Sequence, residues 1–360
     1  MWSMRSKVQP KILVINPGST STKLALFQGD TLIFSQIVAH PEDVLQAAAK
    51  PFDHLDYRIG AVRDFIRKQR IDALDAVVGR GGLLKPLSRG TFAVNDIMIA
   101  DARQGVQGEH VANLGCVIAD QIAKEMNCRA FIVDPVSVDE FEPVARISGH
   151  PLIERRTLSH ALNLRAAAIW AADKQSVNLE KVNYVVAHLG GGISVAAVKN
   201  GRIVDVNDAS SDGPFSPERS GSLPLQQFAE LCFSGRFTEN EIKKMIMGEG
   251  GLKAYLGTAN ITLVESQIKK GDEHAKLIFD AMIYQIAKEI GAMATVVLGK
   301  LQAIVLTGGL THSETLVNLL QGRIAFLAPV LVLPGELEME AMAQGALRVL
   351  QGQELVQEYV

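Results

Sequence analysis

Residues 11–30 read KILVINPGSTSTKLALFQGD, and this stretch decides the fold of the chain. Its two apolar segments, Ile12 to Ile15 and Leu24 to Phe27, are typical of buried β-strands. Between them lie eight small, polar or turn-forming residues, Asn16 to Lys23, whereas a plain hairpin turn needs only about two to five. We therefore interpret Asn16 to Lys23 as a loop with a function of its own, set between two strands.

The same order of segments returns near the middle of the chain, where residues 182–209 read VNYVVAHLGGGISVAAVKNGRIVDVNDA. Each stretch predicts a strand, a loop of small residues, a second strand, a tight turn and a third strand. The loops begin at Asn16 and at His188, and the two tight turns follow at the same distance along the chain. The residue identities differ, so the repeat is one of pattern, and it predicts two duplicated halves.

The rest of the chain alternates helix and strand patterns, which indicates an α/β protein. Helices are expected at 61–70, 111–126, 158–172, 224–234, 273–297 and 338–350, and strands in LDAVVGRGG, RAFIVDP, AIVLTGG and VLVLPG. At 360 residues the chain exceeds the size of a single hydrophobic core, so we expect two domains. Their junction is predicted between Pro135 and Arg156, with the final helix folding back on the first domain.

Composition excludes several classes of protein. A hydrophobic content of 48%, a charged content of 21% and a formal charge of −3 are ordinary for a globular protein, and suggest no nucleic-acid or membrane-surface partner. The three cysteines have no C-x-x-C spacing, which argues against a disulfide framework or a zinc site and indicates a reduced, cytoplasmic protein. No segment predicts a signal peptide or a membrane span.

Three glycine-containing loops each follow a short apolar strand: INPGSTST, AHLGGGIS and VLTGGLTHSE. Small residues allow backbone N–H groups to approach a phosphate closely, and hydroxyl groups add donors. A single Gly-Gly more often marks a bulge or a tight turn, but three such loops together favour a polyphosphate site. The signatures G-x-x-x-x-G-K-[ST] and G-x-G-x-x-G are absent, and GRGG at Gly79 to Gly82 does not supply the second.

Six motifs in order resemble the acetokinase family, within the superfamily of acetate and sugar kinases, heat-shock chaperones and actin. They are NPGSTSTKLALF, VVGRGGLLKPL, DPVSVDE, LSHALN, HLGGGISVA and DGPFSPERSGSLP, and the match runs from residue 12 to about residue 350. The resemblance implies two domains of duplicated ribonuclease-H-like fold with a nucleotide cleft between them. Residues 1–145, completed by 340–360, would bind the acyl substrate, and residues 146–339 would bind the nucleotide.

Several motifs are similar to the butyrate branch of the family. This implies a kinase that uses ATP and Mg²⁺ to convert butanoate into butanoyl phosphate by reversible, direct in-line transfer. Acetate, propionate or branched-chain acids are alternative substrates, and a non-catalytic nucleotide-binding module of the actin or chaperone type is an alternative function. The family also implies a homodimer or a larger homo-oligomer.

The resemblance assigns phosphate and nucleotide contacts to the glycine-containing loops and to YLGTAN. These residues are Asn16, Ser19, Thr20, Ser21, Gly190, Gly191, Gly192, Gly257, Thr258, Gly308 and Gly309. Lys23 is either a phosphate contact or a solvated lysine at a strand edge. Asn260 and Thr262 stand where relatives tend to have an aspartate and an arginine, which leaves the nucleotide preference open.

The chemistry of the acceptor favours arginines over a general base. A fatty-acid carboxylate is already ionised near neutral pH, so the enzyme has to bring two anions together and stabilise charge on the transferring phosphoryl group. With the resemblance, this assigns Arg80 to the acyl carboxylate and Arg219 to the phosphoryl group. Asp134, at a strand end, either orients one of these arginines, contributes to the magnesium site or caps the next turn.

The resemblance places two histidines, His160 and His188, near the phosphates, although histidines at element ends are more often structural. It also assigns Mg²⁺ to Asn16 and Glu338, and leaves the register open among three glutamates. These are Glu336, Glu338 and Glu340. His110 matches the family more weakly, and His40 has no functional interpretation.

Departures from the acetate-specific pattern concern the substrate. Gly191 and Arg156 stand where acetate-specific members have an asparagine and a histidine, so these two contacts do not transfer. Leu83, Leu84, Pro86 and Phe215 are candidate walls of a wider acyl pocket, with ordinary core positions as the alternative. Each buried methylene contributes about 0.8 kcal/mol, which is enough for a chain-length preference but not for absolute selection.

Overall fold

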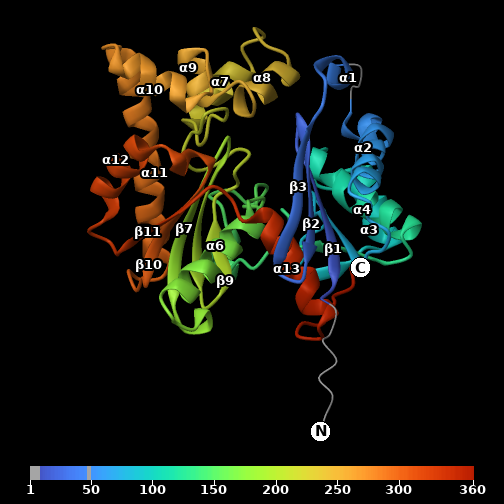
Figure 1. Cartoon of the computed structure of the whole chain (residues 1–360). Coiled ribbons are helices and arrows are strands. Elements are labelled where there is room, and N and C mark those ends of the chain that lie inside the picture. Colours follow the sequence, from blue (N-terminus) through green and yellow to red (C-terminus); the bar gives the residue numbers. More distant parts are fainter. Residues whose placement is uncertain (1–8, 47–49) are drawn as a thin grey trace. The chain divides into compact units, whose positions relative to one another are not determined.

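The computed structural model describes residues 9–46 and 50–360. The chain divides into two compact units, unit 1 (Met1–Asp139 with Leu337–Val360) and unit 2 (Glu140–Glu336). Each unit has its own β-sheet and its own hydrophobic core (Figure 1). In the described part of the chain, no helix is long and apolar enough to cross a membrane.

Unit 1 contains a six-stranded sheet in the order β3-β2-β1-β4-β6-β5. Its strands are β1 (Lys11–Pro17), β2 (Ser21–Gln28), β3 (Thr31–Ala39), β4 (Ala76–Arg80), β5 (Thr91–Ala93) and β6 (Arg129–Val133). The first three strands form an antiparallel meander, and β4 and β6 continue the sheet in parallel with β1. β5, which the sequence pattern did not predict, pairs antiparallel with β6.

The prediction of a loop from Asn16 to Lys23 is wrong. These two residues face each other in the β1–β2 ladder, so that only residues 18–20 connect the strands. The N–H of Gly18 donates to the C=O of Ser21 over 2.7 Å and closes the turn. Asparagine and proline are depleted in strands, but Asn16 and Pro17 still pair because the neighbouring apolar segments set the register.

The helices of unit 1 are α1 (Glu42–Gln46), α2 (Leu55–Lys68), α3 (Asp96–Gln104), α4 (Leu114–Glu125) and α13 (Glu338–Leu350), with the 3₁₀ helices η1 (Pro51–His54) and η2 (Val111–Asn113). α2 and α4 pack on one face of the sheet and α13 on the other (Figure 1). Leu13 and Ile15 of β1 and Val77 of β4 pack in one core cluster with α2 and α4. Because side chains alternate along a strand, Asn16 and Arg80 belong to the opposite face, on which α13 packs.

Unit 2 repeats this topology in the order β11-β10-β7-β8-β9. Its strands are β7 (Asn183–Leu189), β8 (Ile193–Lys199), β9 (Arg202–Val206), β10 (Ala303–Gly308) and β11 (Val330–Pro334). An antiparallel meander is again extended by two parallel strands, so β7, β8 and β9 correspond to β1, β2 and β3. The predicted duplication is confirmed. The second loop is shorter than predicted, because His188 pairs with Ser194 and only residues 190–192 form the turn.

The helices of unit 2 are α5 (Pro143–Arg146), α6 (Ala161–Lys174), α7 (Leu225–Cys232), α8 (Glu239–Ile246), α9 (Gly251–Leu256), α10 (Ile261–Lys269), α11 (Glu273–Val296) and α12 (Glu314–Ile324), with η3 (Leu179–Lys181) and η4 (Gly309–His312). Of these, α6 and α11 pack on the sheet. Val185 and Ala187 of β7 pack with α11 in the main core cluster. By alternation, His188 belongs to the other face, where α6 contacts β7 and β10.

The glycines of the GRGG motif permit close packing in unit 1. A Cβ atom on Gly79 would lie 2.0 Å from the carbonyl oxygen of Gly115 in α4, and one on Gly81 would lie 2.3 Å from Cβ of Pro135. A Cβ atom on Gly82 would meet Asn113 at a similar distance. These glycines therefore let α4 and the segment after β6 approach β4, and they hold the strand end that carries Arg80.

We expect Gly79→Ala to destabilise the protein by about 3 kcal/mol, because the new methyl group would push α4 away from β4. Gly60→Ala is the matched control, since Gly60 lies in α2 with nothing within 4 Å of the added Cβ atom. There the higher helix propensity of alanine predicts a small gain. Chemical denaturation of both variants measures the difference, and equal midpoints would contradict the packing role of Gly79.

Candidate functional site

In unit 1 the structure brings together Asn16, Arg80 and Glu338, which we call the carboxylate cluster. Asn16 lies next to the end of β1, Arg80 is the last residue of β4, and Glu338 is the first residue of α13. Parallel strands β1 and β4 end at the same edge of the sheet, and α13 begins above this edge. Strand alternation then places both side chains on the α13 face.

Glu338 connects the other two members of the carboxylate cluster. Its Oε1 forms an ion pair with the guanidinium of Arg80, and its Oε2 accepts a hydrogen bond of 2.8 Å from the side-chain amide of Asn16. Arg80 is only 6% exposed, so its charge is largely removed from water. A buried charge has to be paired, and Glu338 meets this requirement.

The other two glutamates near Glu338 have different surroundings. Glu336 belongs to unit 2, where one of its carboxylate oxygens lies 3.9 Å from Nε2 of His188. Glu340 lies in the first turn of α13, where acidic residues favour the helix dipole. Only Glu338 of the three is shown in contact with Arg80 and Asn16.

Asp134 directly follows β6 and is almost fully buried. Its Oδ1 accepts a hydrogen bond of 2.7 Å from the N–H of Gly90, and its own N–H donates to the C=O of Gly90 over 3.0 Å. Its φ angle of 38° is unusual for a residue with a side chain. These contacts fix the end of β6 to the segment before β5.

A buried basic residue that the sequence analysis did not identify lies behind the β1–β2 turn. Arg58 of α2 donates to Oγ1 of Thr22 over 3.0 Å and to the carbonyl oxygens of Ser21 and Ser19 over 3.3 and 3.4 Å. A signal was present in the sequence: Arg58 stands four and seven residues before Val62 and Phe65, on the apolar stripe of α2.

In unit 2, His188, Asn163 and Thr307 form the core of what we call the histidine cluster. The side-chain amide of Asn163 donates to Nδ1 of His188 over 2.8 Å and to Oγ1 of Thr307 over 3.3 Å. The Thr307 hydroxyl in turn donates to the C=O of Gly335 over 2.9 Å. Since Nδ1 of His188 accepts, its Nε2 carries the proton and is a donor. LSHALN contains Asn163, but the sequence analysis gave it no role.

The second histidine of the histidine cluster, His160, stacks on His188. The ring centroids are 3.9 Å apart and the ring planes differ by 15°. Nδ1 of His160 lies 2.9 Å from Oγ of Ser194, which faces His188 in the β7–β8 ladder. The two predicted histidines therefore do lie together, and contacts from α6, β8 and β10 hold their orientations.

The three glycines of the β7–β8 turn have side chains packed against them. A Cβ atom on Gly192 would lie 2.3 Å from a terminal nitrogen of Arg219, and a Cβ atom on Gly190 would lie 2.9 Å from Nε2 of His188. The N–H of Gly190 donates to the C=O of Gly192 over 3.2 Å within the turn. These glycines thus leave room for Arg219 and His188 at the turn.

Arg219 follows the loop FSPE and reaches back over the turn. Its Nη1 donates to the C=O of Ala209 over 2.7 Å, and burial lowers its pKa, while Glu218 and Asp208 oppose the shift. Asp208 also pairs with Arg156, whose guanidinium lies 3.0 Å from its carboxylate. Arg219 is therefore a partly buried cation in unit 2, whereas Arg80 in unit 1 is almost fully buried.

The predicted adenosine contacts lie at helix ends. Gly257 caps α9 with φ 70°, and Thr258 Oγ1 accepts from the N–H of Asn260 over 3.1 Å. Asn260 in turn is the N-cap of α10. Gly308 has φ 97°, and an added Cβ atom would meet the backbone of Leu189 at 2.4 Å; Gly309 begins η4.

The candidate acyl-wall residues do not share one environment. Leu84 is fully buried in a core cluster of unit 1, and Phe215 belongs to the main core of unit 2. Leu83 is partly buried and Pro86 is exposed. Leu84 and Phe215 therefore occupy core positions, which was the alternative to a place in the pocket wall.

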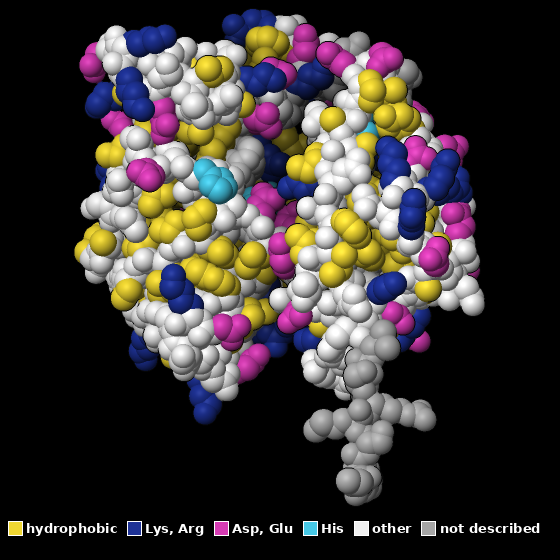
Figure 2. Space-filling view, in the orientation of Figure 1, with side chains coloured by type: hydrophobic (Ala, Val, Ile, Leu, Met, Phe, Trp, Pro, Cys, Tyr) yellow, Lys and Arg dark blue, Asp and Glu magenta, His cyan; other side chains and the backbone are white. Residues whose placement is uncertain are grey.

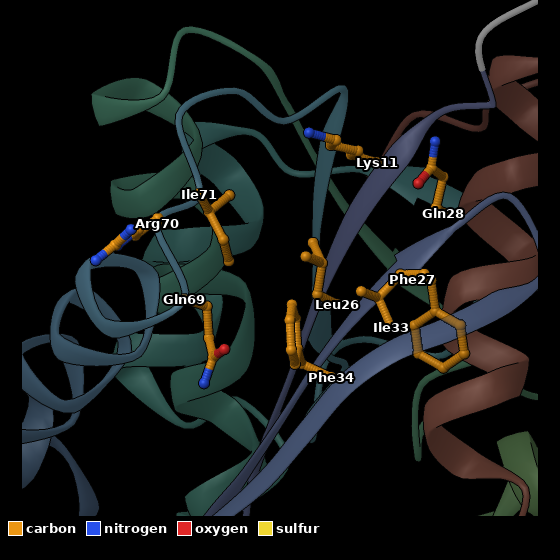
Figure 3. A pocket seen from close by; sticks show the side chains of 9 residues that line it. All are labelled: Lys11, Leu26, Phe27, Gln28, Ile33, Phe34, Gln69, Arg70 and Ile71. Carbon is orange, nitrogen blue, oxygen red and sulfur yellow. The ribbon is translucent and has the colours of Figure 1, made fainter.

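One cavity of unit 1, of about 180 Å³, contains none of the predicted site residues (Figure 3). It lies where β1 begins and β2 ends, away from Asn16 and Arg80. Its lining residues are Lys11, Leu26, Phe27, Gln28, Ile33, Phe34, Gln69, Arg70 and Ile71.

Glu289 of α11 provides a test of the electrostatics in unit 2. Burial, with the carboxylates of Asp212 and Asp205, raises the pKa of Glu289 from near 4.5 to about 7, although Arg155 opposes the shift. The folded protein thus binds this proton more tightly than the unfolded chain, so the stability that it contributes falls as the pH rises from about 4.5 through 7.

We therefore expect Glu289→Gln to raise the free energy of unfolding by about 2 kcal/mol at pH 8 and to leave it nearly unchanged at pH 5. Denaturant titration at the two pH values measures this difference. A loss of stability at pH 8 would show that the carboxylate form of Glu289 is the stabilising one.

The chain is similar in sequence to a known family and to curated proteins. A family model described as the Acetokinase family matches residues 166–328. The chain is 49% identical to "Probable butyrate kinase 2" of Caldanaerobacter subterraneus subsp. tengcongensis, over 96% of this chain and 98% of the relative. It is 46% identical to "Butyrate kinase 2" of Clostridium acetobutylicum, over 97% and 99% of the two chains.

Solved structures agree on the fold. An acetate kinase from Porphyromonas gingivalis has a TM-score of 0.77 at 19% identity, over 95% of this chain and all of that one. A propionate kinase from Francisella tularensis has a TM-score of 0.74 at 19% identity, with 93% and 98% covered. The predicted fold class, α/β with duplicated halves as in the actin-like kinases, is confirmed.

Proposed function

Because the chain belongs to the acetokinase family, we propose that it is a short-chain fatty-acid kinase that converts butanoate and ATP into butanoyl phosphate and ADP. It is a phosphotransferase with a carboxyl group as acceptor. Full-length similarity to two butyrate kinases supports butanoate over the alternative acids. The structural observation that carries the proposal is that each unit holds an arginine shielded from water: Arg80, which is 6% exposed, ends β4, and the partly buried Arg219 packs against the β7–β8 turn.

We assign the acyl carboxylate to Arg80 and the transferring phosphoryl group to Arg219. A guanidinium binds carboxylate or phosphate in a bidentate manner, and in a site shielded from water its charge acts more strongly. The Nε2–H of His188 is a further donor for phosphate oxygens, with its ring orientation set by Asn163 and His160. No general base is needed, because the carboxylate attacks in its ionised form.

The nucleotide is the phosphate donor, and we propose that Mg²⁺ accompanies it. Among the described residues, no group of three or more acidic, cysteine or histidine side chains is arranged to hold a metal. This fits Mg²⁺, which usually keeps several waters and takes one or two carboxylates together with substrate phosphates. The Glu338 carboxylate and the Asn16 amide oxygen would hold it, and the ion would neutralise charge on the phosphates.

We also propose which part of the chain binds each substrate. Residues 1–145 with 340–360 would bind the acid, and 146–339 would bind the nucleotide. We further propose a cytoplasmic homo-oligomer. The edge strand β3 supports self-association: Leu32, Ile33, Phe34 and Ile37 are all exposed, and Figure 2 shows hydrophobic side chains gathered on this unit.

The acyl-phosphate assay tests the function directly. With ATP and Mg²⁺, and with the product trapped as hydroxamate, we expect the highest kcat/KM at four or five carbons in the series acetate, propionate, butyrate, isobutyrate and valerate. Each methylene that is lost should lower kcat/KM by about fourfold, as expected from about 0.8 kcal/mol per buried CH₂. A maximum at acetate would assign the chain to the acetate branch.

The same assay separates the enzyme from a non-catalytic module. Folded protein that binds ATP but phosphorylates no acid in the series would contradict the kinase function. Capture of a protein partner in a nucleotide-dependent manner would then favour the actin-like or chaperone-like alternative.

A further inference from the structure

We propose that Arg58 is a positioning residue that orients the β1–β2 turn and gives it a positive charge for binding a phosphate group of the nucleotide. The inference deepens the proposed function and rests on it. Arg58 lies behind the turn, in α2, and its side chain is 1% exposed.

The hydrogen bonds of Arg58 converge on this one turn. Its acceptors are the carbonyl oxygens of Ser19 and Ser21 and the hydroxyl of Thr22, whereas Nε has no hydrogen-bond partner among the described residues. In a trans peptide the C=O and the next N–H point in opposite directions. Because the Ser19 carbonyl turns inward to Arg58, the N–H of Thr20 turns outward, and both Ser19 and Thr20 are exposed.

Among the described residues, no Asp or Glu forms an ion pair with Arg58, and no carboxylate contributes to its pKa, which burial lowers to about 10. It is therefore still a cation near neutral pH. An uncompensated buried charge destabilises a fold, so a neutral side chain would serve a purely structural role better. A bound anion on the outer side of the turn would supply the missing compensation.

Thr22 and His40 continue this network. Oγ1 of Thr22 accepts from Arg58 and lies 2.9 Å from Nε2 of His40. Burial and the nearby Arg58 lower the pKa of His40 to about 4, so its ring is uncharged near neutral pH. Besides His40, the titratable groups that act on this pair are Tyr57 of α2 and His54 of η1.

The test compares Arg58→Met, Arg58→Lys and the control Arg63→Met in the full chain. Arg63 lies on the same helix but is half exposed and pairs with Glu125. Calorimetric binding of ATP needs no acid substrate. We expect Arg58→Met to weaken ATP binding at least tenfold, with the KM for butyrate changed less than twofold, and Arg63→Met to bind ATP as the native protein does.

The pH dependence of ATP binding by Arg58→Lys tests the proposal even if Arg58→Met is too unstable to measure. Burial lowers the pKa of a lysine, so Arg58→Lys should bind ATP nearly normally at pH 6.5 and lose affinity between pH 7 and 9. The native protein should keep its affinity over this range. Unchanged ATP affinity in Arg58→Met, or a flat pH profile in Arg58→Lys, would overturn the proposal.

These outcomes are distinct from failure of the proposed function. A native protein that phosphorylates no acid but binds ATP in an Arg58-dependent manner would contradict the kinase assignment and support the role of Arg58. The reverse pattern, normal kinase activity and normal ATP binding in both Arg58 variants, would contradict only the role of Arg58.

Discussion

Replacement of Arg80 by methionine is expected to lower acyl-phosphate formation by about 1000-fold. Arg80 is the only cation of the carboxylate cluster. In the proposed mechanism it binds the acyl carboxylate, which has to approach the negatively charged phosphoryl group. Its removal also leaves the carboxylate of Glu338 without its ion-pair partner, which we expect to destabilise the protein by about 3 kcal/mol. Activity per folded molecule and the free energy of unfolding therefore have to be measured together.

Two further variants separate the two effects. Combining Arg80→Met with Glu338→Gln removes the unpaired charge, so stability should recover, which would identify the unpaired carboxylate as the cause of the destabilisation. Arg155→Met breaks another partly buried ion pair, with Asp205 in unit 2, and serves as the control for destabilisation alone. Near-normal turnover in Arg80→Met, measured on folded protein, would remove Arg80 from the mechanism.

Replacement of Arg219 by methionine is expected to lower kcat by about 1000-fold and to change ATP affinity much less. A guanidinium that stabilises charge on the transferring phosphoryl group acts mainly in the transition state, so its loss appears in kcat. Arg219→Lys should recover little, because an ammonium group cannot reproduce the planar, bidentate contact. If Arg219→Met and Arg219→Lys raised KM equally and left kcat unchanged, Arg219 would contribute only to ground-state binding.

Gly192→Ala displaces Arg219 without removing it. The added Cβ atom would overlap the guanidinium, so we expect a smaller but clear loss of kcat in a folded protein. Gly291→Ala is the matched control, because Gly291 lies in α11 with no atom within 4 Å of the added Cβ. If Gly192→Ala has normal kcat, the contact between Arg219 and the turn has no part in catalysis.

By itself, the sequence determined the fold class and most of the sheet. The apolar segments at residues 12–15, 24–27 and 184–187 are strongly patterned, and the repeat of strand, turn and strand predicted the duplicated topology. The resemblance of its motifs to the acetokinase family also identified Arg80 and His188 as candidate site residues. Their roles in the reaction stay predictions, and the variants above test them.

Only the tertiary structure decided which side chains meet. Asn16 and Glu338 are 322 residues apart, and the choice of Glu338 over its neighbours depends on how α13 approaches the sheet, which no local pattern contains. The length of the β1–β2 turn depends on the register of the two strands. The need for glycine in the GRGG motif depends on how closely α4 approaches β4. Arg58 stands on the apolar stripe of α2, but only the packing shows that its side chain is removed from water and contacts the β1–β2 turn. Contacts between distant residues decide burial, pairing and pKa, whereas periodicity reports only which face of an element is apolar.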